Sequence, residues 1–238
     1  MLIVTAGSGD YNYWKTIRYN EARCIEFGYG IKIYDLGGLW FGEAVNDSRC
    51  ESKFRRVKSA MKPELILKAL NETDDDVTWI DGDAFLVRPI DEIEADTSFD
   101  IGLTVRPKRV NKKTHYINAG VIFVKNNPAG RGFVEAWIEA MPPVPTDTTV
   151  KPKHYSDQMT LEETLVLPNI DVIPWDSYGS VHEVHGARVK FFECSKYNNF
   201  NLHLLAVWKG PDEDTKILHF KEHGMNRLNQ YIEEFLSD

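Results

Sequence analysis

The sequence lacks any long apolar run, any excess of positive charge and any closely spaced cysteine pair, and each absence excludes a class of protein. No stretch approaches the roughly 18 consecutive apolar residues that a membrane-spanning helix needs, so we expect no integral membrane segment. Acidic residues number 36 and basic residues 28, which gives a net charge of −8. This balance argues against a nucleic-acid-binding protein and against a polybasic membrane anchor.

Cysteine is scarce, and the opening residues do not have the composition of a secretory signal. The three cysteines, Cys24, Cys50 and Cys194, are widely spaced and form no CxxC pair, so neither a zinc knuckle nor a thioredoxin-like site is indicated. Residues 1–10 contain a short apolar run with no basic segment before it. We therefore expect a cytoplasmic protein with reduced thiols.

The first 36 residues have the pattern of a strand, a helix and a second strand. Leu2–Thr5 and Ile31–Leu36 are short apolar runs that predict strands, and apolar residues at helical spacing predict a helix over Tyr11–Phe27. Such a βαβ unit is typical of a parallel sheet with right-handed crossovers. The sequence therefore predicts the α/β class.

The rest of the chain continues this pattern and contains no internal repeat. We predict strands over residues 77–80, 101–105, 117–124, 170–173, 189–192 and 217–220. We predict helices over residues 54–70, 128–141, 156–165 and 225–236, with Pro63 either kinking the first or starting a second segment. Residues 142–155 are rich in proline and threonine and predict a long loop.

The segment with the clearest chemistry is Asp81-Gly82-Asp83, which directly follows the apolar run over residues 77–80. Strands of open α/β sheets place ligand-binding groups at their carboxyl ends, and a glycine permits a sharp turn there. Both carboxylates then reach one point, where a hard cation such as Mg²⁺ or Mn²⁺ relieves their repulsion. The alternative is a turn in which Asp81 caps backbone amides and Asp83 is solvated.

Several further segments accompany this one in a definite order along the chain. They are Thr5-Ala6-Gly7 followed by Tyr11, Lys62-Pro63 before a helix, Asn118-Ala119-Gly120, Asp157-Gln158, and His219 followed by Lys221. With them the sequence resembles the GT-A-fold nucleotide-sugar glycosyltransferases, most closely the retaining group that includes glycogenin and related galactosyl- and glucosyltransferases. One departure is the usual His-x-x-Gly-x-x-Lys tail, because Gly224 falls five residues after His219 and position 227 is arginine.

The resemblance implies a fold and a set of binding residues. The fold is a single GT-A (Rossmann-like) domain over residues 1–238, with a mostly parallel central sheet and helices on both faces. Residues 1–125 form its nucleotide-sugar-binding half and residues 126–238 its acceptor-binding half. The implied ligands of Mn²⁺ or Mg²⁺ are Asp81, Asp83 and His219. The implied nucleotide-sugar contacts are Thr5, Ala6, Gly7, Tyr11, Lys62, Asp81, Gly82, Asp83, Asn118, Ala119, Gly120 and Lys221.

The resemblance places Asp157 and Gln158 at the reaction centre. In an inverting enzyme Asp157 acts as general base on the acceptor hydroxyl. In a retaining enzyme Asp157 or Gln158 stabilises the cationic sugar from below, and the sequence leaves both roles open. The implied reaction is metal-dependent transfer of a hexose from a nucleoside-diphosphate sugar to a hydroxyl of a glycan, glycolipid or protein. UDP is the commonest donor nucleotide of the family.

The same residues also have structural interpretations. His219 lies in an apolar strand, where a histidine is often a satisfied core residue. Lys62 can be a solvated helix charge, Asp157 an acid at a helix start and Asn118 a partner of a neighbouring loop. Two other functions stay open as well: a phosphatase of the haloacid dehalogenase type with Asp81 as nucleophile, and a non-catalytic nucleotide-sugar-binding protein.

Overall fold

A computed structural model describes residues 1–7, 11–37, 60–106, 117–141, 157–165, 178–199 and 211–220, with the backbone alone at residues 11–13. Outside these ranges lie the predicted strand over residues 170–173, the predicted helix over residues 225–236 and the predicted loop over residues 142–155. The predicted contacts of Lys221 and of the Tyr11 side chain also lie outside the described residues.

In the described part of the chain, a central sheet contains seven strands in the order β2-β1-β3-β6-β5-β8-β7. They are β1 (Leu2–Gly7), β2 (Gly30–Asp35), β3 (Val77–Ile80), β5 (Ile101–Val105), β6 (Ile117–Val124), β7 (Val181–Val184) and β8 (Ala187–Glu193). Pairing is parallel between β2, β1 and β3 and between β5 and β8, and antiparallel around β6 and β7. All strands except β6 and β7 therefore run in one direction, which confirms the mostly parallel sheet.

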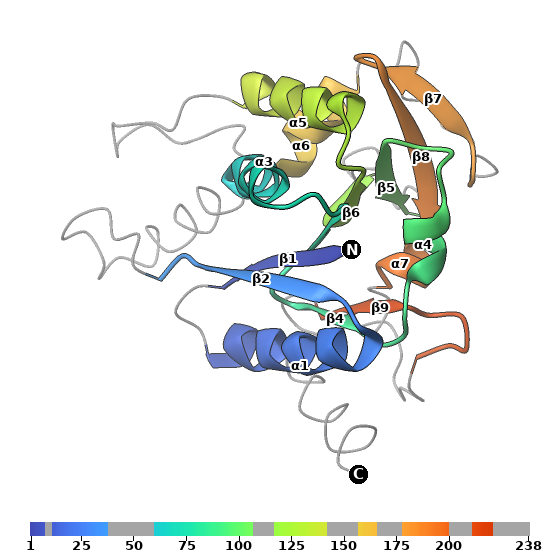
Figure 1. Ribbon diagram of the computed structural model, residues 1–238. Helices are drawn as coiled ribbons and strands as arrows, with labels where there is room; N and C mark the ends of the chain where they lie inside the picture. Colours follow the sequence, from blue (N-terminus) through green and yellow to red (C-terminus); the bar gives the residue numbers. More distant parts are fainter. Residues whose placement is uncertain are drawn as a thin grey trace.

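Helices cover both faces of this sheet, as predicted (Figure 1). The helix α1 (Tyr11–Phe27) lies on one face, and α3 (Lys62–Glu72), α5 (Pro128–Ala140) and α6 (Asp157–Thr164) lie on the other. Strands β3, β5 and β6 are buried along their whole length, because helices exclude water from both sides of the sheet. Their continuous apolar sequences follow from this double coverage.

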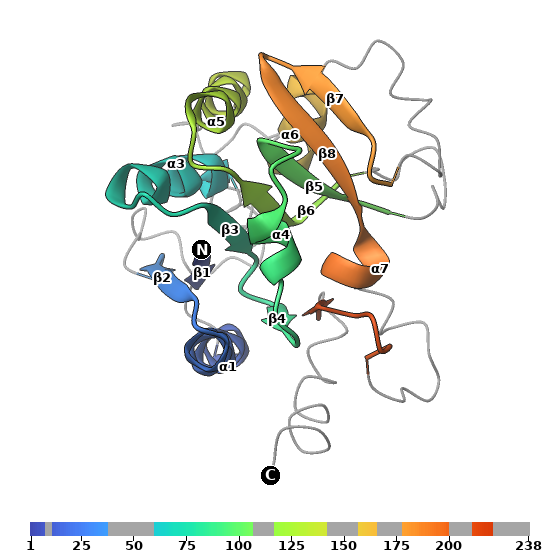
Figure 2. The same cartoon turned by 45° about the vertical axis from the view of Figure 1, so that its right-hand side comes forward.

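A small second ribbon, buried along its length, lies beside α1 and two short helices (Figure 2). It consists of β4 (Ala84–Leu86) and β9 (Ile217–His219), paired antiparallel. The short helices are α4 (Asp91–Ala95) and α7 (Cys194–Tyr197). The ribbon joins the end of β3 to a segment more than 130 residues later in the chain.

Local sequence signals explain several element boundaries. Pro63 lies in the first turn of α3, at the start of this helix, and residues 54–59 of the predicted helix lie outside the described residues. At α5 the Asn127 side chain accepts a hydrogen bond from the Gly130 N–H at 2.8 Å, and Pro128 follows the cap. The hairpin of β7 and β8 turns at His185 and Gly186, whose φ angles are 51° and 73°. Two positive φ angles are typical of a type I′ hairpin turn.

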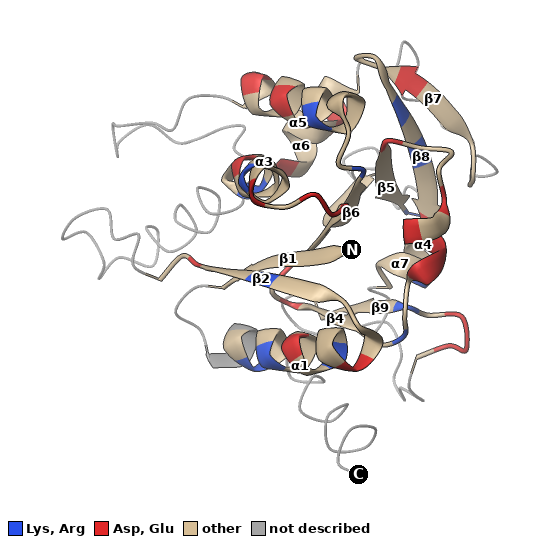
Figure 3. Cartoon of the chain, viewed as in Figure 1, with Lys and Arg blue, Asp and Glu red and all other residues tan. Residues whose placement is uncertain are grey.

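Charge is mixed over the visible elements. Figure 3 shows basic residues spread over α1, α3, α5 and β8, and acidic residues gathered on α4. Among the described residues, no helix has both the length and the apolar character needed to cross a bilayer.

Candidate functional site

The turn after β3 and the pairing of β4 with β9 bring Asp81 and Asp83 next to His219. The chain leaves β3 in a four-residue turn, in which the Asp81 carbonyl accepts a hydrogen bond from the Ala84 N–H at 2.8 Å. It then enters β4, where Ala84 pairs with His219 of β9. The Asp83 carbonyl also accepts a hydrogen bond from the Phe220 N–H at 2.8 Å. Gly82 has no positive φ, so the turn does not depend on left-handed backbone at this glycine.

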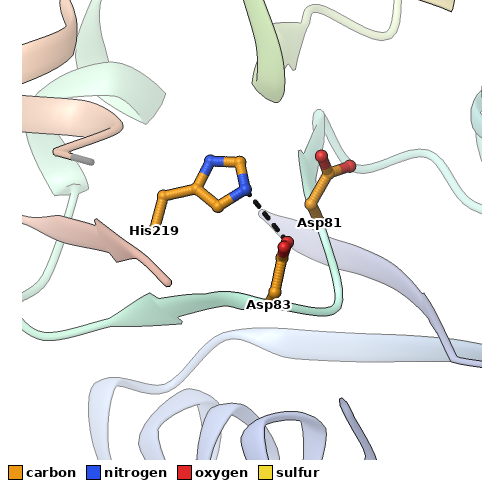
Figure 4. A group of neighbouring side chains, drawn as sticks. All are labelled: Asp81, Asp83 and His219. Atoms are coloured by element: carbon orange, nitrogen blue, oxygen red, sulfur yellow. Dashed lines mark hydrogen bonds and ion pairs between the residues drawn. The ribbon is translucent and has the colours of Figure 1, made fainter. Parts of the chain in front are cut away.

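The three side chains extend to the same side of the ribbon and form a compact cluster (Figure 4). One carboxylate oxygen of each aspartate and one ring nitrogen of His219 all lie within 4.8 Å of one another. The His219 Nε2 atom is 3.0 Å from Asp83 Oδ1. Two ligand atoms about 2.1 Å from one ion and at right angles to each other lie about 3.0 Å apart. The cluster therefore fits a small divalent cation, and two carboxylates with one imidazole suit such an ion.

The imidazole has room only because residue 120 is glycine. A Cβ atom built on Gly120 would lie 2.3 Å from His219 Cε1 and 2.6 Å from His219 Nδ1. The Gly120 carbonyl accepts a hydrogen bond from the Asp81 N–H at 2.8 Å, which attaches the turn to β6. The segment Asn118-Ala119-Gly120 therefore forms one wall of the cluster.

Lys62 connects the cluster to Asp157. Its Nζ atom lies 2.8 Å from Asp81 Oδ1 and 2.5 Å from Asp157 Oδ2, and it donates a hydrogen bond to the Ala119 carbonyl at 2.8 Å. The lysine is only 4% exposed, so its interpretation as a solvated helix charge is wrong. The backbone explains its position, because Lys62 is the first residue of α3 and points from there toward the end of β3.

The charged groups of this site change each other's proton affinity. Burial by itself lowers the pKa of Lys62, but the neighbouring Asp157 and Asp81 outweigh burial and hold this pKa above its usual value. Burial by itself raises the pKa of Asp81. The charges of Lys62 and His219, with hydrogen bonds from Lys62 and from Trp79 Nε1 at 2.7 Å, outweigh it and hold the pKa below its usual value. Lys62 is therefore protonated and Asp81 ionised at neutral pH.

Asp157 is the first residue of α6, as the sequence predicts, and Gln158 follows it. The Gln158 Oε1 atom accepts a hydrogen bond from Arg106 Nη2 at 3.4 Å. Sequence reasoning did not single out Arg106. The available signal was its position directly after β5, because β5 and β3 run in the same direction and end at the same edge of the sheet.

The predicted nucleotide-binding strand ends at this edge too. Strand β1 is parallel to β3, with Val4 opposite Trp79, so Thr5, Ala6 and Gly7 continue alongside the end of β3. The Thr5 hydroxyl is buried and has no hydrogen-bond partner among the described residues.

Comparisons with known proteins give a fold but no sequence family. No protein-family model and no curated protein matches the sequence. The structure is similar to that of a glycosyltransferase involved in the glycosylation of the major capsid of PBCV-1, with a TM-score of 0.60 and 14% identity over 98% of both chains. It is also similar to the apo form of the glycosyltransferase GlyE of Streptococcus pneumoniae TIGR4, with a TM-score of 0.51 and 16% identity. That match covers 93% of this chain and 54% of GlyE.

The chain therefore has the fold of these glycosyltransferases, and the predicted GT-A fold is confirmed. A shared fold does not by itself establish a shared function, which depends on the residues of the site.

Proposed function

We propose that this protein is a metal-dependent glycosyltransferase that moves a hexose from a nucleoside-diphosphate sugar, a UDP-sugar, to an acceptor hydroxyl. One observation carries the proposal: Asp81, Asp83 and His219 converge at the carboxyl end of β3 in a chain with a glycosyltransferase fold. Among the described residues, Lys62 contacts two of the three carboxylates of the site, Asp81 and Asp157, and His219 contacts the third, Asp83.

The residues that hold the donor follow from this arrangement. We propose that Asp81, Asp83 and His219 bind Mn²⁺, with Mg²⁺ as the alternative ion. When bound, the cation offsets the negative charge that develops on the departing diphosphate. The proposed contacts to the nucleotide sugar are Thr5, Ala6, Gly7, Tyr11, Lys62, Gly82, Asn118, Ala119, Gly120 and Lys221.

In the proposed reaction, the bond between the anomeric carbon and the diphosphate oxygen breaks, and its electron pair stays with the diphosphate. A bond forms between the anomeric carbon and the acceptor oxygen, which loses its proton. Asp157 and Gln158 act at this centre. If the product is inverted, Asp157 accepts the acceptor proton. If the product is retained, Asp157 stabilises the cationic sugar and the acceptor proton passes to the departing diphosphate oxygen. Lys62 orients Asp157 through its 2.5 Å contact.

The remaining assignments are proposals of the same kind. We place donor binding in residues 1–125 and acceptor binding in residues 126–238 of one domain. The acceptor is a glycan, glycolipid or protein. Free thiols at Cys24 and Cys194 support a cytoplasmic location.

The test is a thermal-shift panel with UDP, GDP, CMP and ADP, each with Mn²⁺, with Mg²⁺ or without metal. We expect UDP with Mn²⁺ to raise the melting temperature by several degrees, because ligands that bind only the folded state stabilise it. The Asp83→Ala variant removes the shift, whereas Asp74→Ala, which replaces an exposed aspartate outside the cluster, retains it.

Three outcomes contradict the proposal. A panel without any metal-dependent nucleotide shift excludes the donor site. Hydrolysis of p-nitrophenyl phosphate that Asp81→Asn abolishes indicates a phosphatase. Nucleotide binding without turnover of UDP-sugars on any acceptor, or on water, indicates a non-catalytic binding protein.

A further inference from the structure

Asn198 contacts His219 at Nδ1, the ring nitrogen that does not face Asp83. This residue was not identified from the sequence. It directly follows α7 and is fully buried. Its Oδ1 atom lies 2.7 Å from His219 Nδ1. Its Nδ2 atom donates hydrogen bonds to Thr104 Oγ1 at 2.8 Å and to the Asn118 carbonyl at 3.0 Å.

These contacts determine which way the Asn198 amide faces. A backbone carbonyl only accepts hydrogen bonds, so the group that faces the Asn118 carbonyl must be the NH₂. The Thr104 hydroxyl donates to the same carbonyl at 2.7 Å and therefore accepts from Asn198. The Asn198 amide oxygen must then face His219.

The orientation of the amide in turn determines the protonation of the ring. An amide oxygen cannot donate, so His219 Nδ1 must carry a hydrogen to make the 2.7 Å contact. The Asp83 carboxylate also only accepts, so without a cation the 3.0 Å contact from Nε2 needs a hydrogen on that atom. A bound cation would take the place of this hydrogen and face the Nε2 lone pair. Metal-binding histidines are commonly held in this way, with the second ring N–H donated to a fixed acceptor.

We propose that Asn198 is a positioning residue that holds His219 as the Nδ1–H tautomer and aims its Nε2 lone pair at the cation-binding point. The effect of Asn198 on cation binding rests on the proposed function, whereas its effect on the protonation of His219 Nδ1 does not. Gly120 completes the arrangement, because a Cβ there would lie 3.3 Å from Asn198 Oδ1 and would also meet the ring.

The neighbouring Asn199 provides a matched control. It is also buried, and its Nδ2 atom donates to Thr215 Oγ1 at 3.2 Å. Replacing Asn199 therefore removes a buried asparagine side chain from the same segment without removing the acceptor of His219 Nδ1. A difference between the two positions reports the contact with His219 and not a general loss of stability.

The first measurement is NMR of metal-free protein labelled with ¹⁵N-histidine, with the His219 signals assigned from a His219→Gln variant. We expect a protonated Nδ1 in the wild type. This expectation holds for the neutral and for the charged ring, since both carry that hydrogen. In Asn198→Leu the neutral ring loses its Nδ1–H preference, and in Asn199→Ala it keeps it. An unprotonated Nδ1 in the wild type overturns the proposal, even if the leucine variant does not fold.

The second measurement is titration calorimetry with MnCl₂ alone. Asn198→Leu is expected to weaken Mn²⁺ binding about 10- to 100-fold, and Asn199→Ala to change it less than about twofold. Equal affinity of Asn198→Leu and the wild type overturns the proposed role of Asn198. Absence of Mn²⁺ binding by the wild type overturns instead the proposed function. The NMR result still decides whether Asn198 holds a hydrogen on His219 Nδ1.

Discussion

Two groups of charged side chains lie at opposite edges of the central sheet and differ in their balance. At the amino ends of β5 and β8, Asp100 pairs with Arg188 at 2.9 Å and Asp96 pairs with Lys190 at 2.6 Å. We call this the balanced group. At the carboxyl end of β3, Lys62 faces both Asp81 and Asp157, and Asp83 faces His219. We call this the unbalanced group.

The balanced group has a structural role, whereas the unbalanced group contains the residues of the proposed cation site. In the balanced group each carboxylate has its own cation, and Asp100 also accepts the Arg188 backbone N–H at 2.8 Å, so β8 is held against the start of β5. In the unbalanced group, as far as the described residues show, Lys62 is shared by two partly buried carboxylates, and desolvated carboxylates need partners. Under the proposed function, a bound cation is a further partner for Asp81 and Asp83 of this group.

The largest expected effect that separates the groups is at Lys62. Replacement by methionine leaves the partly buried Asp81 and Asp157 without the buried cation that they share and should lower the free energy of unfolding by about 3 kcal/mol. Lys190→Met in the balanced group should cost only about 1 kcal/mol, because Lys190 is 18% exposed, against 4% for Lys62, and pairs with the single carboxylate of Asp96. Urea denaturation measures both. Equal losses at the two positions would remove the distinction between the groups.

A smaller effect is expected at Gly120, which tests the shape of the unbalanced group without changing a charge. In Gly120→Ala the new methyl group would overlap the His219 ring, so we expect a loss of about 1–3 kcal/mol together with loss of the Mn²⁺-dependent thermal shift. Gly132→Ala is the control, since a Cβ there meets no atom within 4 Å. It lies inside α5 and should stabilise the protein by about 0.5–1 kcal/mol. A retained shift in Gly120→Ala contradicts the described position of the ring.

The smallest expected effect is the acid dependence of the balanced group. Hydrogen bonds from Arg188 lower the pKa of Asp100 to about 2, although burial acts in the opposite direction. The folded-state pKa is thus below the unfolded value of about 3.9. The stabilisation is present above about pH 4 and is lost as the pH falls through about 2.

Unfolding of the wild type and of Arg188→Ala, measured from pH 6 to pH 2, checks this dependence. The variant should be less stable near pH 6 and should lose less stability on acidification, while its Mn²⁺-dependent thermal shift at neutral pH stays unchanged. If the variant loses as much stability between pH 6 and pH 2 as the wild type does, Arg188 does not control the pKa of Asp100.

Sequence patterns predicted most of the described fold because they depend on near neighbours. The bounds of α1, β3, β5 and β6 agree with the predicted ones, since long periodic or continuously apolar segments are the strongest local signals. The short elements β4, α4, β7 and α7 were missed. Strand β7 has only four residues, largely in contact with solvent, and its hairpin turn uses His185-Gly186, which is not one of the usual Asn-Gly or Asp-Gly turn sequences.

The candidate site divides in the same way. The pair Asp81 and Asp83 was identifiable from a buried strand followed by a turn, and His219 entered through the family resemblance. Three contacts were not identifiable from the sequence: that of Lys62 with both Asp81 and Asp157, the hydrogen bond from Arg106 to Gln158, and that of Asn198 with His219. Each joins residues from different elements, whose approach depends on how the strands and helices pack.

The sequence by itself determined that two carboxylates follow a buried strand at the carboxyl edge of an α/β sheet, because strand periodicity and turn formation involve only adjacent residues. Only the tertiary structure decided which groups meet them. The pairing of β4 with β9 brings His219 to Asp83 across 136 positions, and the start of α3 buries Lys62 between two carboxylates. The balance of charge at a site is a property of such distant contacts, and therefore of the fold.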